Sequence, residues 1–334
     1  MRKDYPMKSP SLAVIAALAI TILAGCTLNN SRPKSQPIST PAASGNQKLS
    51  LVVGSLTREY VVHVPPQYDG NTPLPVVIMF HGGGGNDTQV ISATGWDAKA
   101  DQEGFLAVFP QGTRPDQSQP RKFVGNPSSW NDGSARGIGA VKGNIDDVGF
   151  VSAMIQDLEQ RYKVDSRHIY ATGFSNGASM TFRLARELPY EFAAVAPVSG
   201  GDWETDVVPD RTTPVIYFTG LADPLNPFDG GNIFIGAKSF GTKEAVPDMI
   251  ASWVKLANCQ EQGRVIYEQD GAKGVAYCGN GNIGVVELYT IEGHGHFWPG
   301  GPTDLPVSVA GKNTAKISAT DVIWNFFLQY ANEN

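Results

Sequence analysis

The sequence contains no long run of basic residues, and its 26 Lys and Arg are outnumbered by 32 Asp and Glu, which gives a formal net charge of -6. Proteins that bind nucleic acids concentrate positive charge where the phosphates lie. We therefore expect no nucleic acid partner. The composition also excludes a disordered chain, because 41% of the residues are hydrophobic and only 17% are charged, which is typical of a folded protein with a sizeable core.

The apolar run Leu12–Leu23 is too short to cross a bilayer comfortably, and it is preceded by a basic start and followed by small residues. Residues 1–26 therefore have the organisation of an export signal. The quartet LAGC at 23–26 resembles the lipobox of bacterial lipoproteins, which implies that Cys26 receives lipid and becomes the new N-terminus. A cleaved signal without lipid, or a single membrane anchor, is the alternative. Because Thr27 rather than Asp follows, the resemblance signals no retention at the inner membrane, and we expect a protein of the outer membrane, the cell surface or the exterior.

Residues 27–47 are rich in Ser, Pro, Asn and Gln and lack the apolar periodicity of a buried segment. We expect them to form a flexible tether. From about Lys48 to the end there is no second stretch of this kind and no internal repeat. The sequence therefore predicts one large domain over residues 48–334.

Cysteine is scarce, with three in the whole chain. Once Cys26 is assigned to the lipid, Cys259 and Cys278 remain, and an exported protein occupies a compartment in which disulfides persist. We expect these two cysteines to pair and to staple a local loop. The alternative is a pair of free, buried thiols.

Short apolar runs rich in β-branched residues recur along the chain, at residues 60–65, 75–80, 105–110, 168–173, 192–200, 214–220 and 285–291. Runs that are apolar throughout suit strands buried on both faces of a parallel sheet. Helix-like segments lie between them, and the clearest follows Asp146 and Asp147. This alternation predicts an α/β domain with a mostly parallel central sheet, and it places functional residues in loops beyond the carboxyl ends of the strands.

One serine stands between two glycines in GFSNG, residues 173–177, where a strand-like run gives way to a helix-like run that Pro189 ends. A serine on such a sharp turn is held in a strained backbone, and a side chain in place of either glycine would collide with the neighbouring strand and helix. The helix N-terminus also offers free N–H groups to developing negative charge. We predict that Ser175 is a nucleophile. The alternative is a glycine-rich turn with an incidental serine.

A serine nucleophile needs a base, and the chain has five histidines. Three lie in or beside strand-like runs, where we expect structural or scaffolding roles: His63, His81 and His168. The other two lie in GHGHFWPGG, a glycine-rich loop after the run 285–291, and we favour His296 as the base and His294 as a neighbour that orients the loop at the substrate. No carboxylate or cysteine cluster accompanies them at ligand spacing, so we expect no metal.

The acid that orients the histidine is expected just past a strand end, between the serine and the histidine in the chain. The run 214–220 leads into Leu221-Ala222-Asp223-Pro224, so we choose Asp223. An Asp before Pro can also simply start a turn, and Asp202 and Asp229 are the reserves.

The tetrahedral intermediate of acyl transfer needs N–H donors aimed at its oxyanion. The strand-like run 75–80 ends in His81 and Gly82–Gly85, where the backbone can approach a substrate closely. We predict that the backbone N–H of Asn176, the residue after the nucleophile, is one donor and that of Gly83 the other. The alternative is a merely flexible glycine loop.

The segments HGGGGN, DDVGFVSAMIQDLEQRYKVDSRHIYATGFSNGASM, LADPLNPF and GHGHFWPGG, in this order and spacing, resemble the extracellular esterase family of the α/β-hydrolase fold. That family joins polyhydroxybutyrate depolymerases, feruloyl esterases and acetylxylan esterase-like lipoproteins. The resemblance covers roughly residues 48–330 and implies helices on both faces of the sheet, a triad of Ser175, Asp223 and His296, a Cys259–Cys278 bridge and no cofactor. Gly83 stands where the depolymerases tend to carry Cys, which favours the feruloyl and acetyl esterase branch.

The resemblance also implies aromatic positions near the pocket, at Trp130 and Trp298, and Phe228 and His294 are further candidates for the substrate side. The sequence thus predicts a monomeric serine carboxylic ester hydrolase, held to the membrane only by its lipid anchor. Feruloyl or acetyl esters of plant polysaccharide are the first expected substrates, and hydroxyalkanoate esters the second. A peptidase on the same fold, and a non-catalytic surface lipoprotein that binds a ligand, are the competing hypotheses.

Overall fold

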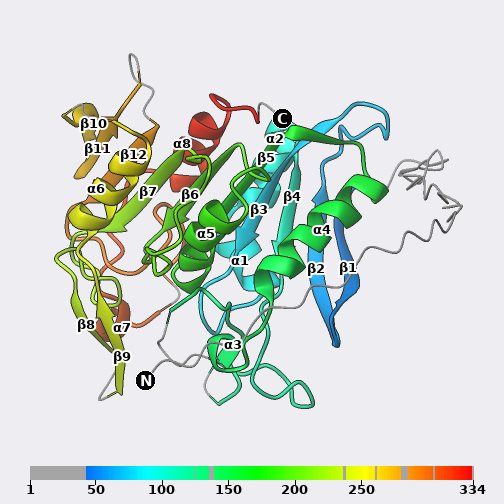
Figure 1. Cartoon of the computed structure of the whole chain (residues 1–334), viewed down its shortest axis with the longest axis horizontal. Coiled ribbons are helices and arrows are strands. Elements are labelled where there is room, and N and C mark those ends of the chain that lie inside the picture. Colours follow the sequence, from blue (N-terminus) through cyan, green and yellow to red (C-terminus); the bar gives the residue numbers. More distant parts are fainter. Residues whose placement is uncertain are drawn as a thin grey trace, which may run out of the picture. The chain divides into compact units, whose positions relative to one another are not determined.

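A computed structural model of the chain describes residues 43–332, with gaps at 124, 135–138, 236–237, 260–261, 280–284 and 304 (Figure 1). The predicted export signal, Cys26 and most of the predicted tether lie outside the described residues. Among the helices of the described part, none combines the length and the hydropathy that crossing a bilayer requires.

The described residues form a ten-stranded sheet with the order β1-β2-β4-β3-β5-β6-β7-β12-β11-β10. Its strands are β1 (Gly45–Val53), β2 (Leu56–Val64), β3 (Leu74–Phe80), β4 (Leu106–Pro110), β5 (Val164–Phe174), β6 (Ala194–Val198), β7 (Val215–Gly220), β10 (Arg264–Gln269), β11 (Ala272–Tyr277) and β12 (Val286–Ile291). The strands from β4 to β12 in this order pair in parallel, and antiparallel strands complete both edges. The mostly parallel central sheet expected from the sequence is confirmed.

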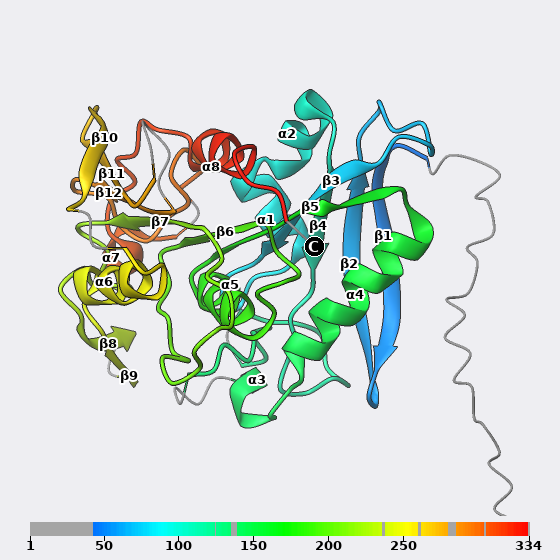
Figure 2. The same cartoon turned by 45° about the horizontal axis from the view of Figure 1, so that its top comes forward.

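Helices cover both faces of this sheet (Figure 2). They are α1 (Asp87–Thr94), α2 (Trp96–Glu103), α3 (Gly139–Lys142), α4 (Asp147–Arg161), α5 (Asn176–Glu187), α6 (Val246–Leu256), α7 (Val307–Ala310) and α8 (Ala319–Phe327). Successive residues of a strand point to opposite faces, and β3 shows this clearly. Val76 and Ile78 pack in one cluster with residues of α4, α5 and α6, whereas Val77 and Met79 pack in another with residues of α1, α2 and α8. The two clusters sandwich the sheet and fix its position against the helices.

Helix α4 illustrates how the local sequence sets an element. The Asp146 side chain caps its first turn by accepting a hydrogen bond from the Gly149 N–H at 2.7 Å. Its apolar residues, spaced along one helical face, are all buried against the sheet: Phe150, Val151, Met154, Ile155 and Leu158. The acidic start and the apolar stripe therefore give a helix where the sequence predicted one.

Two peripheral features lie outside the central sheet. Strands β8 (Gly231–Ile235) and β9 (Lys238–Lys243) form a separate two-stranded sheet. A disulfide joins Cys259, just after α6, to Cys278, just after β11, with the two Cα atoms 5.6 Å apart. The bridge ties the end of α6 to the antiparallel edge of the sheet.

Candidate active site

Ser175 occupies a sharp turn between the end of β5 and the start of α5. Its backbone has φ 56° and ψ -117°, which is a strained conformation for a residue with a side chain. The turn is held because the Ser175 N–H donates to the Val198 carbonyl at 2.9 Å and its carbonyl accepts from Ser179 N–H at 3.1 Å. The side chain is half-buried, so a small molecule can reach it.

The glycines on either side of Ser175 are required by close packing. A Cβ on Gly173 would lie 2.3 Å from the Gly177 carbonyl oxygen. A Cβ on Gly177 would lie 2.2 Å from the Phe80 carbonyl oxygen at the end of β3. The collisions with helix and strand that the sequence analysis expected are therefore confirmed by the geometry.

His296 and Asp223 form a buried pair on two adjacent loops. Asp223 follows β7 and His296 follows β12, and these strands are parallel neighbours. The His296 Nδ1 lies 2.7 Å from Asp223 Oδ2, and both side chains are at most 5% exposed. The other carboxylate oxygen, Oδ1, accepts the N–H groups of Leu225 and Asn226, each at 2.8 Å. The carboxylate is therefore fixed by its own turn and orients the imidazole through Nδ1. The other ring nitrogen, Nε2, is then the one that can accept a proton.

The sheet brings this pair to the edge that carries Ser175. The carboxyl ends of β5, β6, β7 and β12 lie at one edge because these strands are parallel. The ring of Phe174, the residue before the serine, packs against the imidazole of His296 with 4.8 Å between the ring centroids. The structure thus places the turns that carry Ser175, Asp223 and His296 at one edge of the sheet.

The glycine loop after β3 lies beside the serine. A Cβ on Gly82 would lie 3.4 Å from the Ser175 Cβ, and one on Gly83 would lie 3.6 Å from the Asn176 Cβ. The N–H groups of Gly84 and Gly85 are used by the carbonyls of Ser128 and Gly82. Within the described residues the Gly83 N–H has no such acceptor. The Asn176 N–H, at the first position of α5, has no intrahelical acceptor either.

His81 sets the orientation of this loop. Its Nε2 accepts the Gly112 N–H at 3.0 Å, so the proton is on Nδ1, which donates to the Gly82 carbonyl at 2.7 Å. In a trans peptide the N–H points opposite to the carbonyl, so the Gly83 N–H points away from His81. Burial lowers the pKa of His81 to about 4, which keeps the ring neutral and this tautomer in place.

The depressed pKa of His81 predicts a pH-dependent stability. In the unfolded chain His81 is protonated below its ordinary pKa of 6.5, whereas in the folded protein it stays neutral down to about pH 4. The free energy of unfolding should therefore fall as the pH drops through this window, by roughly 3 kcal/mol at about 1.4 kcal/mol per pH unit. Urea unfolding of wild type and His81→Gln at several pH values checks this. If the free energy of unfolding depended on pH equally in the two proteins, His81 would not be the cause of the loss of stability.

Three residues that the sequence analysis placed at the substrate are buried in the structure instead. Trp130 has no exposed surface, and its indole N–H donates to the His81 carbonyl at 2.9 Å. Trp298 is 5% exposed and donates to the Thr320 hydroxyl at 3.0 Å. His294 is fully buried, and both of its ring nitrogens are occupied by backbone groups. Their hydrogen bonds hold the loops around the site in place.

The remaining candidates are one aromatic residue and the two reserve carboxylates. Phe228 is half-buried against the core cluster of α4, α5 and α6. The reserve acid Asp202 is buried and accepts the Arg186 guanidinium through both oxygens, as well as the Trp253 indole N–H. Asp229 is exposed. Asp223 is therefore the carboxylate among these three that holds a histidine.

Two residues near the serine escaped the sequence analysis. Phe123 is 64% exposed, and its ring lies over Gly84, where a Cβ would come within 2.7 Å of Phe123 Cδ2. Asp132 is fully buried and accepts the Asn176 side-chain amide at 2.7 Å, which ties the segment after Trp130 to the serine turn. Phe123 could have been noticed because it is an aromatic residue in a polar segment. Its contact with the glycine loop could not be predicted from the sequence.

The fold and this arrangement define an α/β-hydrolase. Residues 58–208 match the protein family described as Esterase PHB depolymerase. The protein "Putative esterase NocK" from Nocardia uniformis subsp. tsuyamanensis is 29% identical over 299 residues, which cover 83% of this chain and 81% of that one. Feruloyl esterase C from Emericella nidulans is 30% identical over 187 residues, which cover 52% of this chain and 58% of that one.

Among solved structures, the acetyl xylan esterase from Aspergillus awamori superposes with a TM-score of 0.55 at 14% identity, over 84% of this chain and 98% of that one. A likeness at this identity shows the fold. Together these comparisons support a carboxylic ester hydrolase with the α/β-hydrolase fold. The chain spans a little over half the length of the feruloyl esterase it matches.

Proposed function

We propose that the protein is a serine esterase with Ser175 as nucleophile, His296 as general base and Asp223 as the group that orients the base. The observation that carries this proposal is the buried pair of His296 and Asp223, 2.7 Å apart, at the same sheet edge as the strained serine turn. His296 Nε2 takes the proton of the Ser175 hydroxyl while the oxygen attacks the ester carbonyl. The imidazolium then protonates the departing alcohol, and water, activated in the same way, releases the acid from the acyl-enzyme.

The N–H groups of Gly83 and Asn176 are proposed to stabilise the oxyanion of the tetrahedral intermediates. Gly83 and Asn176 lie beside each other next to the serine, and the orientation of the Gly82–Gly83 peptide is fixed by His81. The start of α5 adds the positive end of a helix dipole. These donors are in place before a substrate binds, which is what electrostatic stabilisation of a transition state requires.

Feruloyl or acetyl esters of plant polysaccharide are the proposed substrates. The names of relatives support this class, because they include feruloyl esterases and a bifunctional acetylxylan esterase/xylanase. The exposed ring of Phe123 beside the glycine loop offers an apolar surface to an aromatic acyl group. Short hydroxyalkanoate esters are the second candidate, because the matching family is described as a polyhydroxybutyrate depolymerase esterase.

The function is tested by hydrolysis of p-nitrophenyl acetate, methyl ferulate, acetylated xylan and a hydroxybutyrate oligomer by residues 27–334. Ser175→Ala is expected to lower kcat by more than about 10⁴-fold on every ester that the wild type cleaves. The preferred ester then identifies the substrate class. A folded wild type that is as inactive as the variant on all four esters would instead favour a ligand-binding surface protein.

Phe123→Ala should raise KM for methyl ferulate several-fold while leaving KM for p-nitrophenyl acetate within about two-fold. A buried aromatic contact contributes about 1 kcal/mol, whereas an acetyl group is too small to reach the ring. Stability should hardly change because the side chain is 64% exposed. Michaelis–Menten kinetics on both esters check the split. A parallel change on both esters would place Phe123 outside the acyl pocket.

We also propose that the protein is exported as a lipoprotein, with lipid on Cys26 and a single catalytic domain after the tether. The basis is the sequence of residues 1–47 alone. Mass spectrometry of the N-terminal peptide from membranes should show a diacylglyceryl-modified Cys26. An unmodified N-terminus, or a wild-type amount of membrane-bound protein in Cys26→Ser, would refute the anchor.

A further inference from the structure

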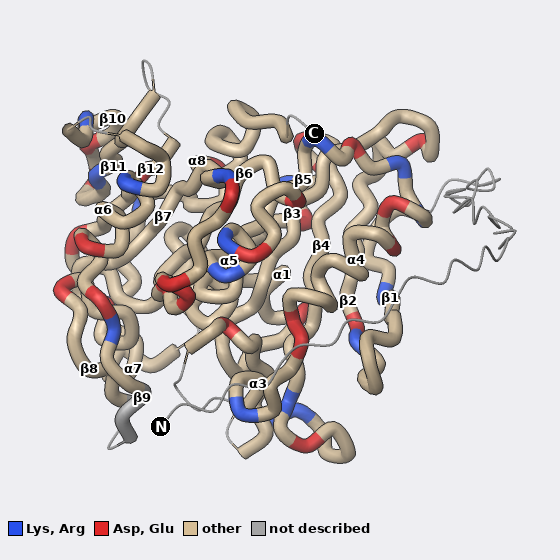
Figure 3. Tube along the Cα trace, in the orientation of Figure 1, with Lys and Arg blue, Asp and Glu red and all other residues tan. Residues whose placement is uncertain are grey.

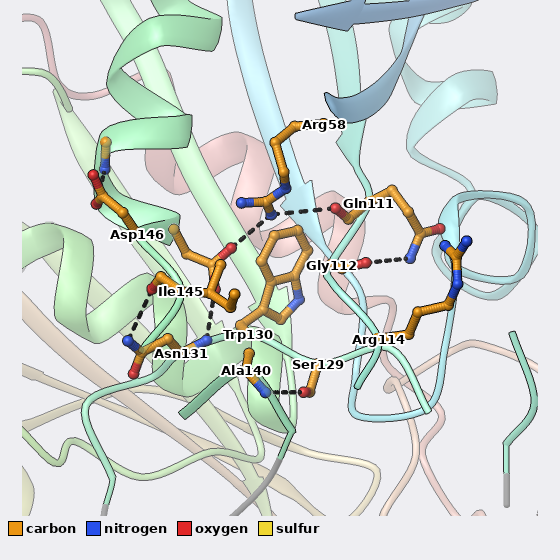
Figure 4. A network of polar contacts seen from close by, with 12 residues as sticks. Arg58, Gln111, Gly112, Arg114, Ser129, Trp130, Asn131, Ala140, Ile145 and Asp146 are labelled. Atoms are coloured by element: carbon orange, nitrogen blue, oxygen red, sulfur yellow. Dashed lines mark hydrogen bonds and ion pairs between the residues drawn. The ribbon is translucent and has the colours of Figure 1, made fainter. Parts of the chain in front are cut away.

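A polar cavity of about 160 Å³ lies next to Gly112, whose N–H donates to His81 of the glycine loop. It is bounded by the start of β2, by the residues directly after β4 and by the loop that follows: Thr57, Arg58, Glu59, Gln111, Gly112, Thr113, Arg114, Gln117 and Arg121. Figure 4 shows Arg58, Gln111, Gly112 and Arg114 around this region. The cavity is connected to the glycine loop through a single hydrogen bond, because its lining residue Gly112 donates to His81, which orients that loop.

The lining is rich in positive charge, with three guanidinium groups against the carboxylate of Glu59. Arg58 is neutralised by the buried Asp147, 2.6 Å away, and Arg121 pairs with Glu59 at 2.8 Å. Arg114 donates to the backbone carbonyls of Gln117 and Gln119, and its charge helps to lower the pKa of the nearby Asp116 carboxyl. Over the rest of the described chain, Lys and Arg are interspersed with Asp and Glu (Figure 3). The lining itself contributes three guanidinium groups and one carboxylate, and this balance favours an anion over a cation.

Two polar atoms at this cavity are buried without a hydrogen-bond partner in the described residues, Thr113 Oγ1 and Arg121 Nε. Thr113 is only 6% exposed. Leaving a buried donor or acceptor unpaired costs about 1–3 kcal/mol, so native proteins normally satisfy such groups. Arg Nε can only donate, and a threonine hydroxyl can donate as well. An acceptor-rich group would satisfy both atoms at once.

We propose that this cavity binds an oxyanionic group, a carboxylate or a phosphate, at a site separate from the ester-cleaving triad. Guanidinium groups form their strongest hydrogen bonds with such oxyanions. A volume of about 160 Å³ is far above the roughly 10–15 Å³ that one water molecule requires by the same measure, so there is room for the group together with part of its carrier. A uronic acid unit of the polysaccharide would supply the carboxylate. That assignment of the carrier rests on the proposed function, whereas the anion site itself does not.

Calorimetric titration of the Ser175→Ala protein tests the site without any dependence on hydrolysis. The probes are D-glucuronate, inorganic phosphate and neutral D-glucose, each at low salt, because added salt screens a partly exposed anion site. Binding of an anion without binding of glucose is expected, and the tighter anion identifies the carrier. Tighter glucuronate favours an acidic sugar, and tighter phosphate favours a phosphorylated ligand.

Two variants decide whether binding is at this cavity. Arg121→Gln and Thr113→Val, each in the Ser175→Ala background, should weaken anion binding by at least ten-fold. Thr113→Val should also melt no lower than its parent, because the hydroxyl it removes has no partner in the described structure. Should Arg121→Gln fail to fold, Thr113→Val alone decides. Arg167→Gln is the matched control, because that side chain is 64% exposed near the amino end of β5.

Absence of anion binding, or equal binding by Thr113→Val and the control variant, would overturn the proposal. Thr113→Val with an intact Ser175 should hydrolyse p-nitrophenyl acetate at the wild-type rate. Loss of anion binding with intact hydrolysis would establish a site apart from the triad. If the wild type cleaves no ester but Ser175→Ala binds an anion as expected, the proposed function fails and the anion site stands.

Discussion

Asn in place of Asp223 is expected to lower kcat/KM for small esters by roughly 10⁴-fold without unfolding the protein. The reason lies in the two oxygens of the carboxylate. Oδ1 accepts the N–H groups of Leu225 and Asn226, and Oδ2 accepts the Nδ1–H of His296. An asparagine has a single oxygen, and the two backbone donors would claim it. Its NH₂ group would then face Nδ1 and stabilise the tautomer that carries the proton on Nε2, which cannot accept the serine proton.

The measurement is kcat/KM for p-nitrophenyl acetate, with a thermal melt of each protein to show that the fold is retained. Asp229→Asn is the matched control, because Asp229 is an exposed carboxylate near Asp223 in the chain, and its activity should equal that of wild type. A loss smaller than about ten-fold in Asp223→Asn would show that the carboxylate does not set the tautomer of His296. The reserve Asp202 could not then replace it, because it is engaged by Arg186 and Trp253.

The central strands could be predicted because burial on both faces leaves a pattern in the sequence. All seven apolar runs form strands, and the parallel ones are covered by helices on both sides. The edge strands of the sheet were harder to predict. Strand β1 alternates between half-buried and exposed residues. Strand β2 pairs antiparallel to β4, although its residues from Tyr60 to Val64 are all buried, like those of the parallel strands. Hydropathy reports how much of a strand is covered, but it does not report the direction of its partner.

The catalytic candidates were predictable for a different reason. A serine turn, an acid past a strand end and a late histidine each follow a parallel strand, and the topology alone brings the ends of these strands together. Recognition residues have no such constraint. Trp130 and Trp298 were candidates by resemblance, yet their indole N–H groups donate to the His81 carbonyl and the Thr320 hydroxyl. Phe123 reaches the glycine loop through a tertiary contact that no periodicity encodes.

Gly177→Ala is expected to destabilise the fold by about 3 kcal/mol or more, at the upper end of what overpacking costs. The added Cβ would lie 2.2 Å from the Phe80 carbonyl oxygen and 2.6 Å from that of His81. Both atoms are backbone, one at the end of a central strand and the other at the start of the glycine loop, so no side chain can rotate away. Either α5 moves off the sheet or the loop that carries Gly83 shifts. Both changes alter the position of Ser175 relative to the Gly83 N–H.

Gly83→Ala is the matched control for this variant. Its Cβ would lie 3.6 Å from the Asn176 Cβ, an ordinary contact, and its backbone is not in the left-handed region. It should therefore melt within a few degrees of wild type, whereas Gly177→Ala should unfold at clearly lower urea concentration and lose ester hydrolysis together with stability. A stable but inactive Gly177→Ala would show that the turn yields locally, and that Gly177 is required for the geometry of the oxyanion donors rather than for the fold.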